Sequence, residues 1–163
     1  MNQESANKIC KNYQSLTGII CTAVFMKMGK NHIPSKLIKG EEQGVYVFTR
    51  NETTFKVGKA GTNSQARWNS HHYNLDITTT STLTKSFMRD LENFKTFFPV
   101  NASREIGNIN KLQIKNWIQN NMSRIEFKIS SKESSIALNL LEALVQFNFP
   151  PIYEGKHPSR LQQ

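Results

Sequence analysis

Alternating apolar and polar residues predict a β-hairpin near the middle of the chain. The runs Val45–Phe48 and Thr54–Val57 both resemble strands, and a polar arginine–asparagine–glutamate turn separates them. Residues 124–130 alternate isoleucine and phenylalanine with charged side chains, which predicts a further strand with one face buried. These three strands together predict a small, largely antiparallel sheet.

A helical period of apolar residues predicts helices on both sides of the hairpin. Residues 4–16 fit a short helix, whereas the apolar run 18–28 fits either a strand or a buried helix. Further helices are predicted over residues 62–73, 84–98, 109–121 and 132–147. This order of elements is typical of a mixed α/β (α+β) domain, and the length of 163 residues fits a single domain.

The last two helices each have a predicted buried side. Trp117 and Ile118 point inward from the first of them. In the final helix the predicted buried residues are Ile136, Leu140, Leu141, Leu144 and Val145. Glu142 falls just beyond this apolar arc, beside Asn139, where a glutamate is ordinarily part of the solvated surface.

Charge and composition add a candidate class of ligand. The chain carries a net charge of +9 spread along its length, which fits binding of a polyanion, nucleic acid before membrane, and fits a merely basic soluble protein equally well. The start of the chain is polar, and the apolar run 18–26 is too short to span a bilayer. Cys10 and Cys21 are isolated in the sequence and lack zinc-ligand spacing, so we expect reduced thiols in a cytoplasmic protein.

Residues that can do chemistry follow one another in a specific order. The hairpin carries Gly44-Val45-Tyr46 and then Lys56-Val57-Gly58, the next helix carries Arg67 and His71, and the last helix carries Glu142. Arg67 and His71 are four residues apart and are therefore expected on one face of their helix. In this ordered set the chain resembles the GIY-YIG nuclease family.

The resemblance implies an active site for phosphodiester hydrolysis. Tyr46 would be the general base on the attacking water, Arg67 would clamp the phosphate, and His71 would orient the nucleophile or the phosphate. Glu142 would hold one divalent metal ion, Mg²⁺ or Mn²⁺. Since a tyrosine with a pKa of about 10 is a poor base at neutral pH, we expect the positive charge of Lys56 to lower the pKa of Tyr46.

Two positions depart from the usual pattern of the family. Lys56 stands where a tyrosine is usual, as it does in a branch of the family that includes restriction enzymes. After the glutamate the family often has an asparagine near a pair of prolines. Here Asn148 and Tyr153 both remain candidates for that polar role.

The resemblance also implies how the single domain, residues 1–163, is organised. It covers residues 44–73 and 124–154, so residues 1–43 would be an N-terminal extension and residues 76–122 a helical insertion. We expect both additions to help to bind DNA. The basic residues expected to contact DNA are Lys59, Lys85, Arg89, Lys111 and Lys115.

The sequence therefore predicts a stand-alone, metal-dependent DNA endonuclease of the restriction or defence type. The alternatives are a nuclease for repair or branched DNA, a catalytically silent nucleic-acid-binding module on the same fold, and a basic structural protein whose matches are accidental. One such site cuts one strand. Cleavage of both strands would then require a homodimer or two successive encounters.

Overall fold

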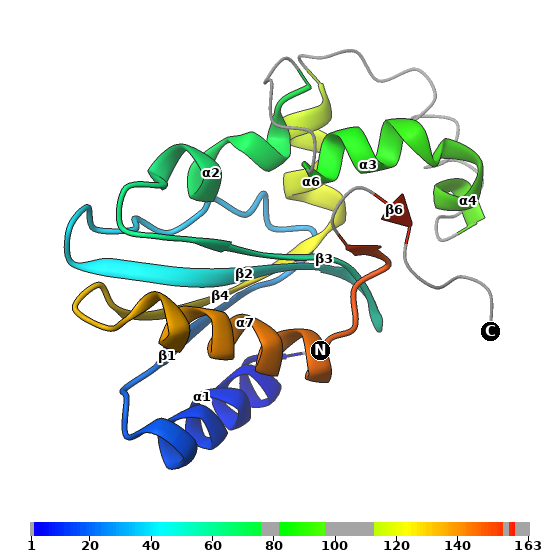
Figure 1. Cartoon of the computed structure of the whole chain (residues 1–163). Coiled ribbons are helices and arrows are strands. Elements are labelled where there is room, and N and C mark those ends of the chain that lie inside the picture. Colours follow the sequence, from blue (N-terminus) through cyan, green and yellow to red (C-terminus); the bar gives the residue numbers. More distant parts are fainter. Residues whose placement is uncertain (1, 76–81, 97–112, 155–156, 159–163) are drawn as a thin grey trace.

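A four-stranded antiparallel sheet forms the centre of the computed structural model, which describes residues 2–75, 82–96, 113–154 and 157–158 (Figure 1). Its strands, in spatial order, are β1 (Thr22–Met26), β4 (Ser123–Ser130), β2 (Glu42–Arg50) and β3 (Thr53–Ala60). The predicted α+β class is confirmed. The sheet has four strands instead of three because the apolar run 18–28 contributes the edge strand β1.

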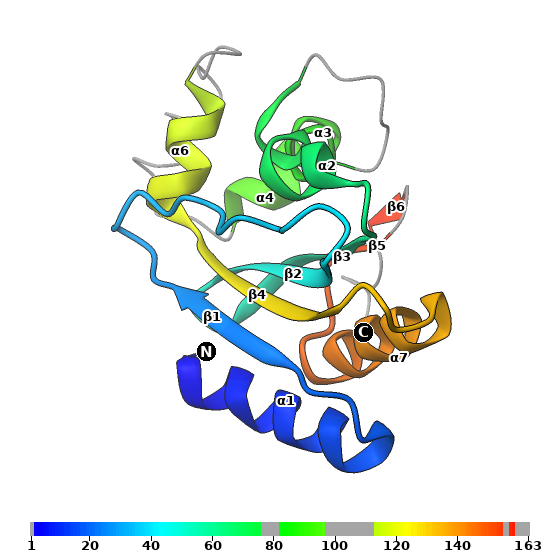
Figure 2. The same cartoon turned by 90° about the vertical axis from the view of Figure 1, so that its left-hand side faces the viewer.

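Helices cover both faces of this sheet (Figures 1 and 2). One face is covered by α1 (Gln3–Thr17) and α7 (Ser135–Asn148), and the other by α2 (Gln65–Asn69), the 3-10 turn η1 (His71–Tyr73), α3 (Leu83–Arg89), α4 (Leu91–Thr96) and α6 (Ile114–Asn121). The short strands β5 (Tyr153–Glu154) and β6 (His157–Pro158) pair separately. Among the described residues, no helix is both long and apolar enough to cross a membrane.

Strand β2 is buried on both faces because its alternating side chains enter two separate cores. Val45 and Val47 belong to the core beneath α1 and α7. Tyr46 and Phe48 belong to the opposite core, where Trp68 of α2 is also fully buried. A strand covered on both sides has no face left for solvent. The side chain of Tyr46 consequently points toward α2 and η1, away from α7.

The helix predicted over residues 84–98 is interrupted at Asp90, where α3 ends and α4 follows. The backbone of Asp90 leaves the helical region, with φ of −121° and ψ of 37°. Its carboxylate accepts hydrogen bonds from the side chains of Asn93 (2.7 Å) and Tyr153 (3.1 Å). Side-chain bonding of this kind competes with continuation of a helix. Residues 97–112 lie outside the described residues.

Polar and sulfur contacts fasten α1 to the edge strand β1. The side-chain amide of Gln3 accepts a hydrogen bond from the N–H of Phe25 (2.8 Å) and donates one to the carbonyl oxygen of Ala23 (2.9 Å). Farther along, the sulfur atoms of Cys10 and Cys21 lie 3.0 Å apart as free, buried thiols. The two cysteines are therefore neighbours in space, and their expected isolation holds only along the sequence.

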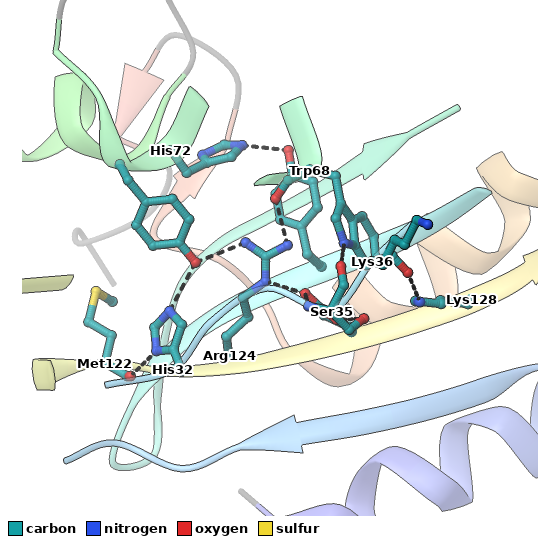
Figure 3. Close-up of polar contacts among 11 residues, drawn as sticks. His32, Ser35, Lys36, Trp68, His72, Met122, Arg124 and Lys128 are labelled. Carbon is teal, nitrogen blue, oxygen red and sulfur yellow. Dashed lines mark hydrogen bonds and ion pairs between the residues drawn. The ribbon is translucent and has the colours of Figure 1, made fainter. Parts of the chain in front are cut away.

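The strand predicted over residues 124–130 is confirmed as part of β4, but the prediction that it is half-buried is wrong, because Arg124 and Glu126 are as buried as the apolar residues and, of its charged residues, only Lys128 is partly exposed. Arg124 and Glu126 are both 0% exposed, and Arg124 Nε donates to Glu126 Oε1 over 2.8 Å. Other nitrogens of the guanidinium donate to the Trp68 carbonyl oxygen (2.8 Å) and to Tyr73 Oη (3.0 Å), as Figure 3 shows. Pairing and hydrogen bonding make burial of these charges tolerable.

His32, in the loop after β1, continues this buried network. Its Nδ1–H donates to the Met122 carbonyl oxygen (2.9 Å), so its Nε2 is unprotonated and accepts the hydrogen bond of the Tyr73 hydroxyl (2.9 Å). Burial, followed by the positive charge of Arg124, lowers the pKa of His32 to about 4. The imidazole is therefore neutral at physiological pH.

Acidification is expected to destabilise the fold through His32. Its pKa is about 4 in the folded chain and 6.5 in the unfolded chain, so the unfolded chain binds the extra proton between these values. This contribution to stability is complete above pH 6.5 and is lost as the pH falls toward 4, by up to about 3 kcal/mol. Urea unfolding of wild type and His32→Gln across this range measures it. Equal losses of stability in both proteins would contradict the prediction.

Candidate active site

The Tyr46 hydroxyl lies against the backbone of the neighbouring strand at Gly58. The two residues are directly opposite each other in the β2–β3 ladder, and Tyr46 is fully buried. A Cβ atom added to Gly58 would lie 2.5 Å from Tyr46 Oη and 2.7 Å from Tyr46 Cζ. A side chain at position 58 and the ring of Tyr46 therefore exclude one another. This packing explains why glycine follows Lys56-Val57 on the second strand.

Two N–H groups converge on Tyr46 Oη. His72 Nε2 lies 2.5 Å from this oxygen, and the N–H of Leu83 donates to His72 Nδ1 over 3.1 Å. Because Nδ1 accepts that bond, the neutral ring carries its proton on Nε2 and donates to the tyrosine. Arg67 Nε–H donates to the same oxygen over 3.3 Å.

The charges around this oxygen act on its pKa in both directions. Burial raises the pKa of Tyr46, while the guanidinium groups of Arg67 and Arg124 lower it and the Glu142 carboxylate raises it. Burial also lowers the pKa of His72 well below its ordinary value, helped by the charges of Arg124, Lys56 and Arg67. His72 is therefore neutral at pH 7, as its donor role requires.

Glu142 approaches the same region from α7, on the opposite side of the sheet. Its Oε2 pairs with Lys59 Nζ over 2.6 Å, and the same ammonium donates to Asn139 Oδ1 over 2.8 Å. The side chain of Lys59 is 37% exposed and that of Glu142 is 19% exposed. Lys59 directly follows Gly58, so Glu142 lies across the sheet from Tyr46 at the same strand position, and its charge acts on Tyr46.

Lys56 lies on the strand next to Tyr46, as expected, but its effect on Tyr46 differs from the expected one. It is 3% exposed and lies in register with Phe48, on the Tyr46 side of the sheet. Its charge acts on His72 and helps to lower the pKa of that residue. The expected lowering of the Tyr46 pKa is wrong, because burial raises it and the leading opposing charges are Arg67 and Arg124.

The prediction that Arg67 and His71 share one helix face is also wrong. α2 ends at Asn69, and residues 71–73 form the separate turn η1. This break buries His72 and turns it toward Tyr46, while His71 is only partly buried. Spacing by four identifies a partner only on a continuous helix. In the sequence, the feature that could have pointed to His72 as a site residue is its position next to His71 in a short, polar segment.

The remaining predicted site residues lie around this centre or beyond the described residues. Lys85 and Arg89 are on α3, Lys115 is exposed on α6, and Lys111 lies outside the described residues. Of the two candidates for the late polar role, Asn148 is exposed and donates to the Leu144 carbonyl oxygen (2.8 Å), whereas Tyr153 is buried and donates to Asp90.

Glu142 is the carboxylate of this set that a metal ion could use if most of its other ligands came from water and substrate. In the described ranges, no group of three or more His, Cys, Asp or Glu side chains is placed to hold a metal ion. Mg²⁺ commonly takes only one or two protein carboxylates together with water and phosphate. Glu142 supplies one such carboxylate at the rim of the site, and its Oε1 makes no hydrogen bond to described residues.

Comparison of the chain with models of known protein families, with curated proteins and with solved structures found no match. Its function is therefore inferred from the geometry around Tyr46.

The contact between Gly58 and Tyr46 gives a direct test of this geometry. Gly58→Ala places a methyl group against the phenol ring and is expected to reduce the free energy of unfolding by about 1 to 3 kcal/mol, as overpacking does. Gly61→Ala is the matched control, because a Cβ there meets nothing within 4 Å. Its effect should stay within about 0.5 kcal/mol. Equal unfolding midpoints for the two variants in urea would refute the contact.

Proposed function

We propose that this chain is a metal-dependent endonuclease of the GIY-YIG type that hydrolyses DNA phosphodiester bonds. The observation that carries the proposal is the environment of Tyr46 Oη, which accepts hydrogen bonds from Arg67 and His72 beside Gly58, with Glu142 acting on it from α7. Such convergence of a buried tyrosine with cationic and acidic groups is typical of catalytic sites.

Tyr46 serves as the general base in this proposal. The N–H groups of His72 and Arg67 both point to the phenol oxygen, so they stabilise the tyrosinate form more than the neutral phenol. They also direct the remaining hydroxyl proton away from themselves. To act as the base, Tyr46 must first lose its own hydroxyl proton to solvent, against the burial that raises its pKa; the tyrosinate would then take a proton from the attacking water.

Arg67 has a second role at the phosphate. Only its Nε is engaged by Tyr46, and its terminal nitrogens make no hydrogen bond to the described residues. The planar guanidinium can therefore present them to two non-bridging oxygens while it holds the base. This arrangement couples the position of the base to the position of the scissile phosphate.

Glu142 would hold one Mg²⁺ or Mn²⁺ ion. When bound, such an ion neutralises negative charge that grows on the phosphate and on the leaving oxygen. Lys59 orients the carboxylate through the 2.6 Å ion pair, and its partly exposed ammonium is also suited to a DNA phosphate. His71 and Lys56 remain proposed contributors, Lys56 through His72.

The Lys59–Glu142 ion pair also favours one alternative. It already neutralises the one carboxylate in this proposed set, and a chain that keeps the pair intact would bind nucleic acid without cutting it. The net charge of +9 suits both functions. The two candidates therefore differ in chemistry and share the expected ligand.

Incubation of the purified protein with supercoiled plasmid separates them. The nuclease converts plasmid to nicked or linear DNA with Mg²⁺ and stops in EDTA, and Tyr46→Phe should lower the rate by about 10²- to 10⁴-fold. A salt-sensitive gel shift without cleavage would support the silent binder. If the protein neither cleaves nor shifts the DNA, both candidate functions are refuted.

Unmodified and methylated plasmids compared in the same assay test the restriction or defence role. The order of nicks and double-strand breaks tests whether two copies act together.

A further inference from the structure

A cleft of ≈ 520 Å³ lies between the loop after β1, the end of α2 and the exposed side of α6. Figure 2 shows the loop, drawn in light blue, running from β1 past α6 and on beneath α2. The loop contributes Asn31, Ile33, Pro34 and Lys36 to one wall. The other side is lined by Asn69 and by the α6 residues Lys115, Asn116 and Gln119. This cleft brings the proposed N-terminal extension and the helical insertion together.

The loop wall is irregular but firmly held. The indole Nε1–H of Trp68 donates to the Ser35 carbonyl oxygen (2.8 Å), and the N–H of Ser35 donates to Glu126 Oε2 (3.2 Å). Lys128 Nζ donates to the carbonyl oxygen of Lys36, a contact that Figure 3 also draws. These bonds tie the loop to the buried Arg124–Glu126 pair, so the wall needs little ordering before a ligand binds.

The helix wall is joined to the same loop through the backbone. The N–H of His32 donates to the Gln119 carbonyl oxygen (3.1 Å), and the N–H of Gly29 donates to that of Asn120 (2.8 Å). The relative position of the two walls is therefore set by main-chain hydrogen bonds.

Gln119 presents its side-chain amide to the cleft. It lines the cleft and is 5% exposed, yet its side-chain amide makes no hydrogen bond within the described part of the chain. The amide is not among the fully buried side-chain atoms that lack a partner, so it is open to the cleft and available to a ligand there. The exposed amides of Asn116, Asn31 and Asn69 line the same cleft. Each of these amides carries both a hydrogen-bond donor and an acceptor, so the cleft offers several such groups to a ligand.

The other lining residues indicate which ligand this is. Lys36 and Lys115 contribute positive charge, and the described residues that line the cleft include no carboxylate. Ile33, which is 73% exposed, and Pro34 add apolar surface at the rim. Lysines bind phosphates, amides of asparagine and glutamine pair with the N6 and N7 edge of adenine, and apolar side chains contact the methyl group of thymine.

Trp68 links the cleft to the proposed catalytic centre. It lies between Arg67, which contacts Tyr46, and Asn69, which lines the cleft. Its indole holds the loop, and its carbonyl oxygen accepts a hydrogen bond from Arg124, whose guanidinium lies 5.2 Å from the Tyr46 ring centroid. The cleft and Tyr46 are consequently held by one buried network.

We propose that this cleft reads the base sequence of DNA beside the scissile phosphate, with Gln119 and Asn116 selecting an adenine. The inference rests on the proposed function for its reference to cleavage, while base recognition itself is measurable without cleavage. Lys36 and Lys115 hold the backbone in this arrangement, and the amides supply the specificity.

The test selects bound sequences from a random DNA duplex pool in EDTA, where no cleavage occurs. Wild type should enrich adenine at one position. Gln119→Met, which removes the amide and keeps the volume, and Asn116→Ala should each lower that enrichment by about 10- to 100-fold, the discrimination of one bidentate base contact. Asn120→Ala on the same helix, outside the cleft, is the matched control and should keep the preference.

Lys115→Ala should act differently from the amide variants. It should weaken binding to all sequences alike and lower the slope of log affinity against log salt by about 0.9, whereas Lys8→Ala on the opposite face should not. Four outcomes would each overturn the inference. Wild type could show no base preference, or both amide variants could keep it. Asn120→Ala could lose it, or an RNA pool could be selected more strongly than DNA. Sequence-selective binding without cleavage in Mg²⁺ would refute the nuclease and keep the cleft.

Discussion

Glu142→Ala is expected to abolish DNA cleavage while the protein still folds and binds DNA. Removing an electrostatic contribution to the transition state of this kind costs at least about 10²-fold in rate. The side chain is partly exposed, so its loss leaves no large cavity. DNA affinity should be kept or improved, because Lys59 is released from its ion pair and a repulsion between carboxylate and phosphate disappears.

Two further measurements distinguish the proposed metal-binding role of Glu142 from the effect of removing any negative charge at this position. Asn139→Ala removes the other partner of Lys59 and keeps the carboxylate, so it should cleave nearly as fast as wild type. The melting temperature of wild type should rise as Mg²⁺ is added, and that of Glu142→Ala should rise much less. Nicking by Glu142→Ala at saturating Mg²⁺ would show that the metal site lies elsewhere.

The buried Arg124–Glu126 pair is expected to give the largest single effect on stability. Glu126→Leu leaves a guanidinium buried without its counter-charge, and Arg124→Met leaves an uncompensated carboxylate. Either change should lower the free energy of unfolding by about 3 to 5 kcal/mol. The double variant should lose less than the sum of the two, because no unpaired charge remains.

A partly exposed pair supplies the control for this experiment. Lys128 and Glu42 lie 3.3 Å apart with side chains 15% and 27% exposed. Glu42→Gln should therefore change stability by no more than about 1 kcal/mol. If the single core variants do not fold, Glu126→Gln keeps the shape of the side chain and provides a measurable intermediate. Additive losses in the double-mutant cycle would contradict coupling between the two charges.

Local periodicity predicted most of the helices and strands, but it did not predict which side of each one is buried against the rest of the protein. The hairpin, α1 and the inward positions of Trp117 and Ile118 agree with the structure because each depends on a local pattern. In α7 the buried arc is rotated, so that Ile136 is 76% exposed although it was predicted to be buried. That helix is apolar on more than one side, and periodicity alone does not identify the side that packs.

The site could be predicted only as far as the order of its residues. Arg124 and Glu126 look like the solvent side of an alternating strand, because alternation says nothing about a loop that covers the second face. His72 was not selected because the helix ends before it. Both depend on contacts between distant segments, which a single sequence does not reveal.

The contact between Gln3 and β1 has a consequence for molecules in solution. An edge strand ordinarily presents unpaired N–H and carbonyl groups on which another chain can add a strand, a common route to aggregation. Here the amide of Gln3 already occupies the N–H of Phe25 and the carbonyl oxygen of Ala23. An incoming strand must first displace a side chain anchored on α1, so the sheet is protected against lateral growth into fibres from this edge.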